Sequence, residues 1–263
     1  MNVNSTAVAA AIFTLCAFAL TYSRATNISR RARIFWLIGI SILSLPGASF
    51  AFYYTHLLPE TSWYYQFRSI TGTEFLVIPL GIVGGLIAAS LPRPLLILPL
   101  LATTALCVVP FIKPIIGPFA NDQLSENWAG DVCLQSTGST CGPASLATVL
   151  NHLGTKLTEA VIVERAHTYR NGTEAWYLAR IARAEGYHPK FDFHQAYNPN
   201  VPTPCIAGVR LGAIGHFIPI LEITDTTVTI ADPLRGKETL SRAELLDRYT
   251  FTGFYLVIHP IDS

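Results

Sequence analysis

The first half of the chain consists of long apolar runs separated by short polar or basic stretches. The runs cover residues 6–22, 34–52, 73–90 and 95–112. Each falls within the range of about 17 to 25 residues that a helix needs to cross the hydrocarbon core of a bilayer. The pattern therefore predicts a region of four transmembrane helices over residues 1–112.

The residues that flank these runs fit this interpretation. A cleaved signal peptide is the alternative for the first run, but no basic region precedes it and a stop-transfer cluster of arginines follows it. Aromatic residues gather in the loop after the second run, as they do at membrane–water boundaries. Gly81, Gly84 and Gly85 give the third run a small face for close helix packing.

Charge sets the expected orientation of the spans. The loops at 23–33 and 91–94 carry five arginines, whereas the loop at 53–72 and the segment after residue 112 carry only Arg68 and Lys113. Because Lys- and Arg-rich loops stay in the cytoplasm, we expect both termini on the extracytoplasmic side of the cytoplasmic membrane.

The second half has shorter apolar runs that are typical of a domain of ordinary size. The spacing predicts helices over 146–153, 157–169 and 175–185, and strands over 190–194, 203–209, 216–223, 226–231 and 251–258. Ser241 and Glu244 form a capping box that opens a short helix before the last strand. The order predicts a tether over 113–130 and an α+β domain over 131–263 with a mainly antiparallel sheet.

The composition limits the kinds of molecule that the chain is expected to bind. The chain is 51% hydrophobic and only 13% charged, whereas about 25% charged is usual for soluble domains, and this agrees with a membrane part. A net charge of +1 and the lack of a Lys/Arg-rich cluster in the second half argue against nucleic acid. Paired CxxC or HxxxH spacings are absent from the sequence, so we expect no metal and no cofactor.

Cys141 stands where a polar, glycine-containing loop meets a helix. Apolar residues at i, i+3, i+4 and i+7 from Leu146 form one helix face, which places Cys141 at or just before the first turn. The positive end of the helix dipole stabilises a thiolate there. Gln135 can direct an amide N–H into the same space, which would supply the donor that acyl transfer requires. The alternative is an inert, buried cysteine.

His216 is the base that we predict for this nucleophile. It follows Gly215 and opens an apolar strand, and Asp232 ends the next strand. An antiparallel hairpin with its turn near Asp225 would make His216 and Asp232 cross-strand neighbours. A carboxylate in that position can hold the imidazole tautomer and stabilise the imidazolium.

Four motifs in this order carry a resemblance to a known family: Gln135, Cys141-Gly142-Pro143, Gly215-His216-Phe217 and Ile230-Ala231-Asp232-Pro233. The chain resembles the C39 family of papain-like cysteine peptidases, which remove double-glycine leader peptides from bacteriocin precursors. The resemblance covers about residues 131–259. It implies a papain-like fold, with Cys141 as nucleophile, His216 as base, Asp232 as orienting acid and Gln135 as oxyanion donor.

The arrangement of parts differs from that of the bacteriocin exporters in this family. There the peptidase lies in the cytosol ahead of a transporter with an ATPase domain, whereas here the apolar spans come first. The sequence has no GxxxxGK[ST] phosphate-binding motif, so we expect no use of ATP. We expect a membrane-anchored peptidase that cleaves an exported or membrane-associated peptide or protein on the extracytoplasmic side.

Other interpretations stay open. The acyl group could pass to an amine rather than to water, or a degenerate domain could bind or dock a peptide without cleaving it. The spans carry few central polar groups of the kind that a transport pathway requires, so anchoring is their expected role. Cys133 could pair with Cys205 or trap Cys141, and an odd number of cysteines in this part leaves at least one thiol free.

Overall fold

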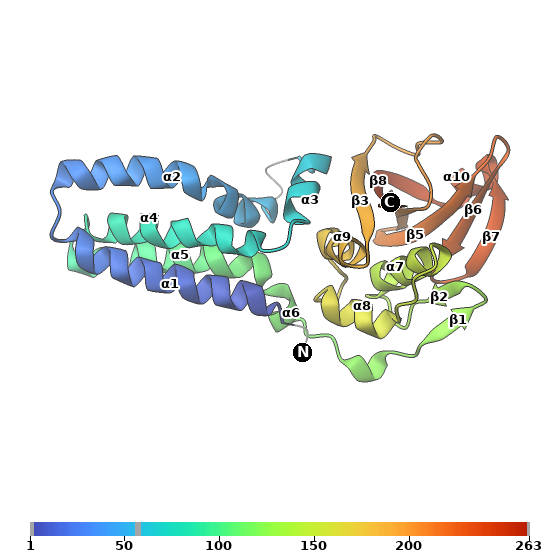
Figure 1. Cartoon of the computed structure of the whole chain (residues 1–263), viewed down its shortest axis with the longest axis horizontal. Coiled ribbons are helices and arrows are strands. Elements are labelled where there is room, and N and C mark those ends of the chain that lie inside the picture. Colours follow the sequence, from blue (N-terminus) through green and yellow to red (C-terminus); the bar gives the residue numbers. More distant parts are fainter. Residues whose placement is uncertain (1–2, 56–58, 262–263) are drawn as a thin grey trace. The chain divides into compact units, whose positions relative to one another are not determined.

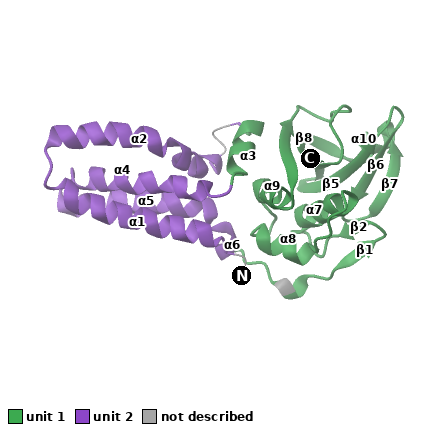
Figure 2. Ribbon diagram, in the orientation of Figure 1, with its two compact units in different colours: residues 1–2, 60–70, 117–263 green, residues 3–59, 71–116 purple. Residues whose placement is uncertain are grey.

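A computed structural model describes residues 3–55 and 59–261 of the chain (Figure 1). The chain divides into two compact units (Figure 2). A helical unit holds Val3–Pro59 and Thr71–Ile116, and an α+β unit holds Glu60–Ile70 together with Gly117–Ser263. Residues 60–70, which the sequence places between two spans, therefore group with the C-terminal domain.

The helical unit contains four main helices. They are α1 (Ser5–Ala25), α2 (Arg30–Tyr53), α4 (Ile78–Ala88) and α5 (Ile97–Val108), with the short turns η1 (Thr73–Val77), η2 (Arg93–Leu95), η3 (Val109–Phe111) and α6 (Lys113–Ile116). Asn4 and Ser29 cap α1 and α2, because each side chain accepts a hydrogen bond from a backbone N–H of the first turn.

Three of the predicted spans have the length and composition to cross a membrane: Ser5–Ala25, Arg30–Tyr53 and Arg93–Phe111. The third predicted run is shorter in the structure than the sequence suggests, because a five-residue 3₁₀ turn precedes an α4 of only 11 residues. Among the described residues it reaches the required length only when it is counted together with Ser62–Arg68. The fourth span stays a prediction.

The glycine face predicted for the third run packs tightly within the helical unit. A Cβ atom at Gly81 would overlap the backbone carbonyl of Thr14 in α1, and one at Gly85 would overlap that of Phe18. Close approach of α4 to α1 therefore requires glycine at these positions.

From Cys141 onwards the α+β unit has three helices followed by the strands of the main sheet, as predicted, and a short hairpin precedes them. Its helices are α3 (Ser62–Arg68), η4 (Asn121–Gln123), α7 (Cys141–His152), α8 (Glu159–Arg165), α9 (Ala175–Ala184) and α10 (Arg242–Arg248). Its strands are β1 (Asn127–Ala129), β2 (Val132–Leu134), β3 (Tyr187–Phe193), β4 (Cys205–Leu211), β5 (Ile214–Ile223), β6 (Thr227–Asp232), β7 (Gly236–Ser241) and β8 (Thr250–Pro260). The capping box of Ser241 and Glu244 is confirmed at the start of α10.

Three details differ from the prediction. The helix expected over 157–169 covers only Glu159–Arg165, because Thr158 caps its start and His167 takes a positive φ of 51° after its end. The strand β7 and the hairpin of β1 and β2 were not predicted. Few apolar residues alternate in β7, which is an edge strand that pairs with β6.

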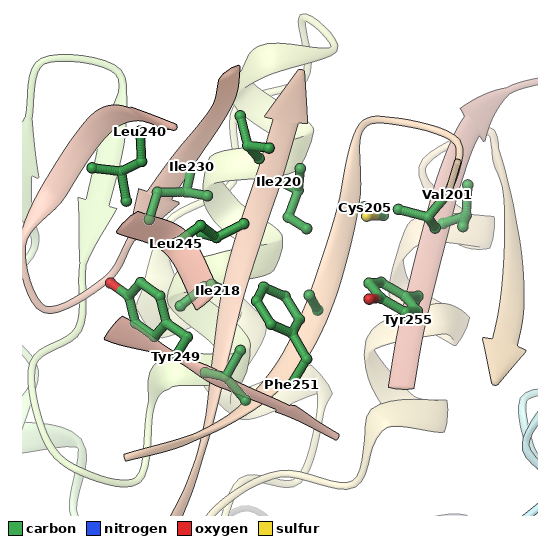
Figure 3. Packing of buried hydrophobic residues seen from close by; sticks show 14 residues of the cluster. Val201, Cys205, Ile218, Ile220, Ile230, Leu240, Leu245, Tyr249, Phe251 and Tyr255 are labelled. Atoms are coloured by element: carbon green, nitrogen blue, oxygen red, sulfur yellow. The ribbon is translucent and has the colours of Figure 1, made fainter. Parts of the chain in front are cut away.

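Six strands form one antiparallel sheet in the order β3-β8-β4-β5-β6-β7, which confirms the predicted antiparallel character. Alternate residues of β4, β5 and β6 build a core cluster on one face (Figure 3). Leu245 of α10 packs into this cluster beside Ile218 and Ile230, and Tyr249 follows α10 at its edge (Figure 3). The core thereby fixes the strands that carry the candidate site.

Candidate active site

Cys141 is the first residue of α7, as the sequence predicts. The preceding turn is held by Thr140, whose backbone N–H donates to the carbonyl of Thr137 and whose Oγ1 accepts from the Thr137 N–H at 3.1 Å. The first N–H groups of a helix lack partners within it and carry partial positive charge. The Cys141 side chain therefore lies at the positive end of the α7 dipole.

His216 and Asp232 meet across the hairpin of β5 and β6. His216 Nε2 lies 2.8 Å from Asp232 Oδ1, and the two residues are only 6% and 1% exposed. Cys141 lines the same cleft as His216, and its interaction with the imidazole raises the pKa of His216. Since Nε2 contacts Asp232, Nδ1 is the ring nitrogen that remains to interact with the Cys141 thiol. The structure thus brings the three residues together, because Cys141 and His216 line one cleft and His216 contacts Asp232.

The hydrogen bonds and charges around His216 favour a charged imidazole. Burial lowers the pKa of His216, but the hydrogen bonds to Asp232 and Cys141 and the charges of both outweigh burial and raise the pKa to about 9. Burial raises the pKa of Asp232, yet its hydrogen bonds to His216, the Leu234 N–H and Tyr249 lower it overall. Both shifts stabilise an imidazolium beside a carboxylate.

Tyr249 is a contact of this site that sequence reasoning missed. Its hydroxyl donates to Asp232 Oδ2 at 2.7 Å, while the Leu234 N–H donates to Oδ1 at 2.9 Å. Tyr249 is 2% exposed. It lies just after α10, and its position depends on how that helix packs on the sheet, so neither spacing nor motif could have indicated it.

Gln135 lies beside the Asp232 turn, because its backbone N–H donates to the carbonyl of Pro233 at 3.0 Å. Its side-chain Nε2 donates to the carbonyl of Thr137 at 2.7 Å. Its Oε1 is buried with no hydrogen-bond partner in the part of the chain that the structure describes. The structure places Gln135 next to the loop that leads to Cys141, and its role as oxyanion donor stays a prediction.

Two further contacts hold the site and were not predicted. The Ser145 hydroxyl, one turn after Cys141, donates to the carbonyl of Phe217 at 3.1 Å and so joins α7 to the residue after His216. Glu159, 1% exposed, accepts from the Ser136 N–H at 3.0 Å and from the Ser136 hydroxyl. Glu159 therefore fixes the loop that precedes Cys141. A buried glutamate next to an N-cap threonine gives no sequence signal of such a role.

A cleft of about 530 Å³ opens at the site. Its lining includes Cys141 and His216, and also Tyr65, Glu60, Glu174 and Arg210. All of these residues belong to the α+β unit. The cleft is large enough for several residues of an extended peptide.

The other cysteines differ from Cys141. All five are free thiols, so the structure contains neither a Cys133–Cys205 disulfide nor a Cys133–Cys141 disulfide. Cys133 and Cys205 are fully buried. Burial, with the charges of Glu159 and Glu126, raises the pKa of Cys133 to about 12, and burial raises that of Cys205 as well. Cys141, in contrast, lines the cleft.

A cysteine at a helix N-terminus, facing a histidine and an aspartate from an antiparallel sheet, is the arrangement of papain-like cysteine hydrolases. Comparison with known proteins agrees. Residues 130–263 match the Peptidase C39 family. The chain belongs to this family, and its C-terminal half is a C39 cysteine peptidase domain.

Two relatives are each similar to about half of this chain. An uncharacterized protein of Methanothermobacter marburgensis is 33% identical over 135 residues, which cover 51% of this chain and 92% of that protein. The mesentericin-Y105 transport/processing ATP-binding protein MesD of Leuconostoc mesenteroides is 27% identical over 126 residues, 46% of this chain and 18% of that protein. Among solved structures, the double glycine motif protease from an AMS/PCAT transporter, in complex with its leader peptide, has 24% identity and a TM-score of 0.43, over 49% of this chain and 91% of that one.

Proposed function

We propose that the chain is a membrane-anchored cysteine peptidase that cleaves a peptide or protein on the extracytoplasmic side through an acyl-enzyme on Cys141. The observation that carries this proposal is the 2.8 Å contact between His216 Nε2 and Asp232, together with the position of Cys141 and His216 in the lining of one cleft. Membership of the C39 family supports peptide cleavage as the reaction.

In the proposed reaction, His216 Nδ1 takes the thiol proton of Cys141. The thiolate attacks the scissile carbonyl carbon and forms a tetrahedral oxyanion. The N–H of Cys141 at the helix start and the amide of Gln135 stabilise that oxyanion. The imidazolium then protonates the leaving amine, and a water molecule, deprotonated by His216, hydrolyses the thioester. Asp232 holds the imidazole orientation throughout.

The grouping of residues 60–70 with the C-terminal domain supports the proposed topology. Glu60–Ile70 and Gly117–Ser263 belong to one compact unit, so both lie on the same side of a membrane. The chain between them then crosses an even number of times. Since Arg93–Phe111 is long enough for one crossing, the run that contains α4 supplies the other. The arginine-rich loops at 23–33 and 91–94 favour the extracytoplasmic side for the peptidase.

The catalytic proposal is tested by alkylation of the detergent-purified full chain with iodoacetamide across pH, followed by peptide mass spectrometry. We expect Cys141 to react well below the pKa of about 8.5 of a free thiol. His216→Ala should slow this reaction by roughly tenfold or more at pH 6 to 7, because each unit of thiol pKa changes the thiolate fraction tenfold. The matched control is His188→Ala, which removes an exposed histidine and should leave the rate unchanged.

The outcome that contradicts the proposal is equally clear. If Cys141 reacts no faster than an unactivated thiol, and His216→Ala has no effect, the domain binds peptides without cleaving them. Incubation with added amines then separates hydrolysis from acyl transfer in an active enzyme, because transfer would yield the amide of the added amine.

The topology is tested with a membrane-impermeant maleimide on spheroplasts, in a Cys16→Ser/Cys141→Ala background. Trp63→Cys, at a position 67% exposed in α3, should be labelled from outside. Ile28→Cys, in the basic loop between α1 and α2, should be labelled only after permeabilisation. The reverse pattern would place the peptidase in the cytoplasm.

A further inference from the structure

The segment Glu60–Ile70 is part of the wall of the catalytic cleft, although it lies between two apolar runs in the sequence. Glu60 and Tyr65 line the same cleft as Cys141 and His216. In Figure 2, α3 has the colour of the α+β unit. The cleft therefore contains residues from outside the matched family region, which begins at residue 130.

Several contacts hold this segment rigidly in place. The ring of Tyr65 packs against Trp176, Phe191, Phe193 and Phe254 with centroid distances of 5.1–5.8 Å, and it is 7% exposed. A pre-organised wall of this kind loses little entropy when a substrate binds.

Polar contacts add to this aromatic packing. Gln66 pairs with the edge strand β3, because its Nε2 donates to the carbonyl of Pro189 and its Oε1 accepts from the Phe191 N–H. The guanidinium of Arg68, which is 1% exposed, lies 4.5 Å from the Trp176 ring. The segment is thus bonded to the edge strand β3 through both polar atoms of the Gln66 side chain.

Glu60 brings a carboxylate to the cleft. The hydroxyl of Tyr65 donates to Glu60 Oε2 at 3.0 Å, so the buried aromatic cluster also fixes the direction of this carboxylate. Glu174 lines the cleft as well and accepts from the Tyr169 hydroxyl at 3.2 Å. Arg210, near the turn between β4 and β5, brings a guanidinium to the same lining. Glu60 and Glu174 thus place two carboxylates in the lining of the cleft.

We propose that Glu60–Ile70 is a specificity element of the cleft and that Glu60 selects substrates with a cationic side chain at the subsite it borders. The proposal rests on the proposed function of Cys141 as nucleophile. A carboxylate held by a buried tyrosine attracts Lys or Arg and repels Asp or Glu, and its effect is larger in a cleft than in open water.

The first test measures the field at Cys141 with three methanethiosulfonate reagents that differ in charge. In each case the thiolate displaces methanesulfinate and forms a mixed disulfide. The full chain in detergent is treated with the trimethylammonioethyl, sulfonatoethyl and methyl reagents, and the Cys141 peptide is quantified by mass spectrometry. We expect Glu60→Gln to lower the ratio of cationic to anionic rates by roughly three- to tenfold at low salt.

A control variant and the neutral reagent separate failure of the proposed function from failure of this inference. Gln at position 60 can still accept from Tyr65, and Glu222→Gln removes an exposed carboxylate that does not line the cleft. If the neutral reagent shows an unreactive Cys141, the proposed function fails, whereas a normal neutral rate with an unchanged charge ratio overturns only the inference. In the wild type, the ratio should also fall towards one in 1 M salt, which tests the field even if Glu60→Gln does not fold.

The second test concerns selection itself. Peptidyl acyloxymethyl ketones that differ only by Lys, norleucine or Glu at one position are scanned along the peptide, and their second-order inactivation rates are measured. We expect one position at which Lys exceeds norleucine and norleucine exceeds Glu. This preference should disappear in Glu60→Gln and persist in Glu222→Gln. Equal rates for Lys and norleucine at every position would overturn the proposal.

Discussion

The hydroxyl of Tyr249 donates a 2.7 Å hydrogen bond to Asp232, on the carboxylate oxygen that does not contact His216. Both residues are nearly fully buried, at 2% and 1% exposure. The Asp232 carboxylate thus contacts His216 through one oxygen and Tyr249 through the other. Its orientation towards the imidazole therefore depends on Tyr249, which follows α10. Tyr249 is a positioning residue in the proposed peptidase.

Tyr249→Phe should test this relationship. Loss of a hydrogen bond to a buried carboxylate is expected to cost about 1–3 kcal/mol of the free energy of unfolding. The pKa of Asp232 should rise, because one of the bonds that lower it is removed. Asp232 contributes stability above its ordinary pKa of 3.8, and this contribution is lost as the pH falls through its lower folded-state value.

The acid unfolding midpoint of Tyr249→Phe should therefore shift upwards, and so should the acid limb of Cys141 acylation. Thermal unfolding and acylation rates between pH 3 and pH 7 provide the measurement. A variant that loses thermal stability without any change in the pH dependence would show that Tyr249 only packs the core.

The pH dependence on the alkaline side should report His216. Its pKa is raised to about 9 from an ordinary 6.5, so its contribution to stability is complete below pH 6.5 and is lost as the pH rises through about 9. Cleavage of an amide requires the imidazolium as the acid for the leaving amine, and kcat/KM should fall above about pH 9.

Alkylation of the thiolate by iodoacetamide does not require that acid, so its rate should not fall over the same range. Asp232→Asn removes the carboxylate that raises the pKa of His216 and should move the alkaline limb to lower pH. If kcat/KM falls at the same alkaline pH in Asp232→Asn as in the wild type, a group other than His216 causes that fall.

Glu159→Gln should loosen the loop before the nucleophile. The Glu159 carboxylate accepts from both the N–H and the hydroxyl of Ser136, and a neutral amide accepts more weakly and presents an N–H to one of these donors. We expect a loss of about 1–3 kcal/mol in unfolding free energy and a slower acylation of Cys141. Glu164→Gln, at an exposed position on the same helix α8, is the control and should match the wild type in both measurements.

Gly81→Ala should weaken the helical unit. The added Cβ would overlap the backbone carbonyl of Thr14, so α1 and α4 would have to separate, at a cost of about 1–3 kcal/mol. Gly39→Ala in α2 is the matched control, because a Cβ there meets nothing within 4 Å. Thermal aggregation of the purified chain in detergent, compared between the two variants, gives the measurement. Equal stability would mean that the two helices do not pack as closely as the structure has them.

The sequence by itself determined those features that depend on local spacing. The apolar face that begins at Leu146 places Cys141 at the first turn of α7, because helical periodicity is a property of a few consecutive residues. His216 and Asp232 lie in adjacent strands of one hairpin, so their contact needs only a short connection and an antiparallel register. The same holds for the glycine face of α4.

Only the tertiary structure decided the contacts between distant segments. Tyr249 reaches Asp232 from the end of α10, Glu159 reaches Ser136 across 23 positions, and Gln66 reaches Phe191 across 125. Each depends on the packing of elements whose order in the sequence carries no spacing signal. The segment Glu60–Ile70 is the largest such case. Its aromatic residues match a membrane boundary equally well, and only the hydrophobic cluster around Tyr65 assigns them to the α+β unit.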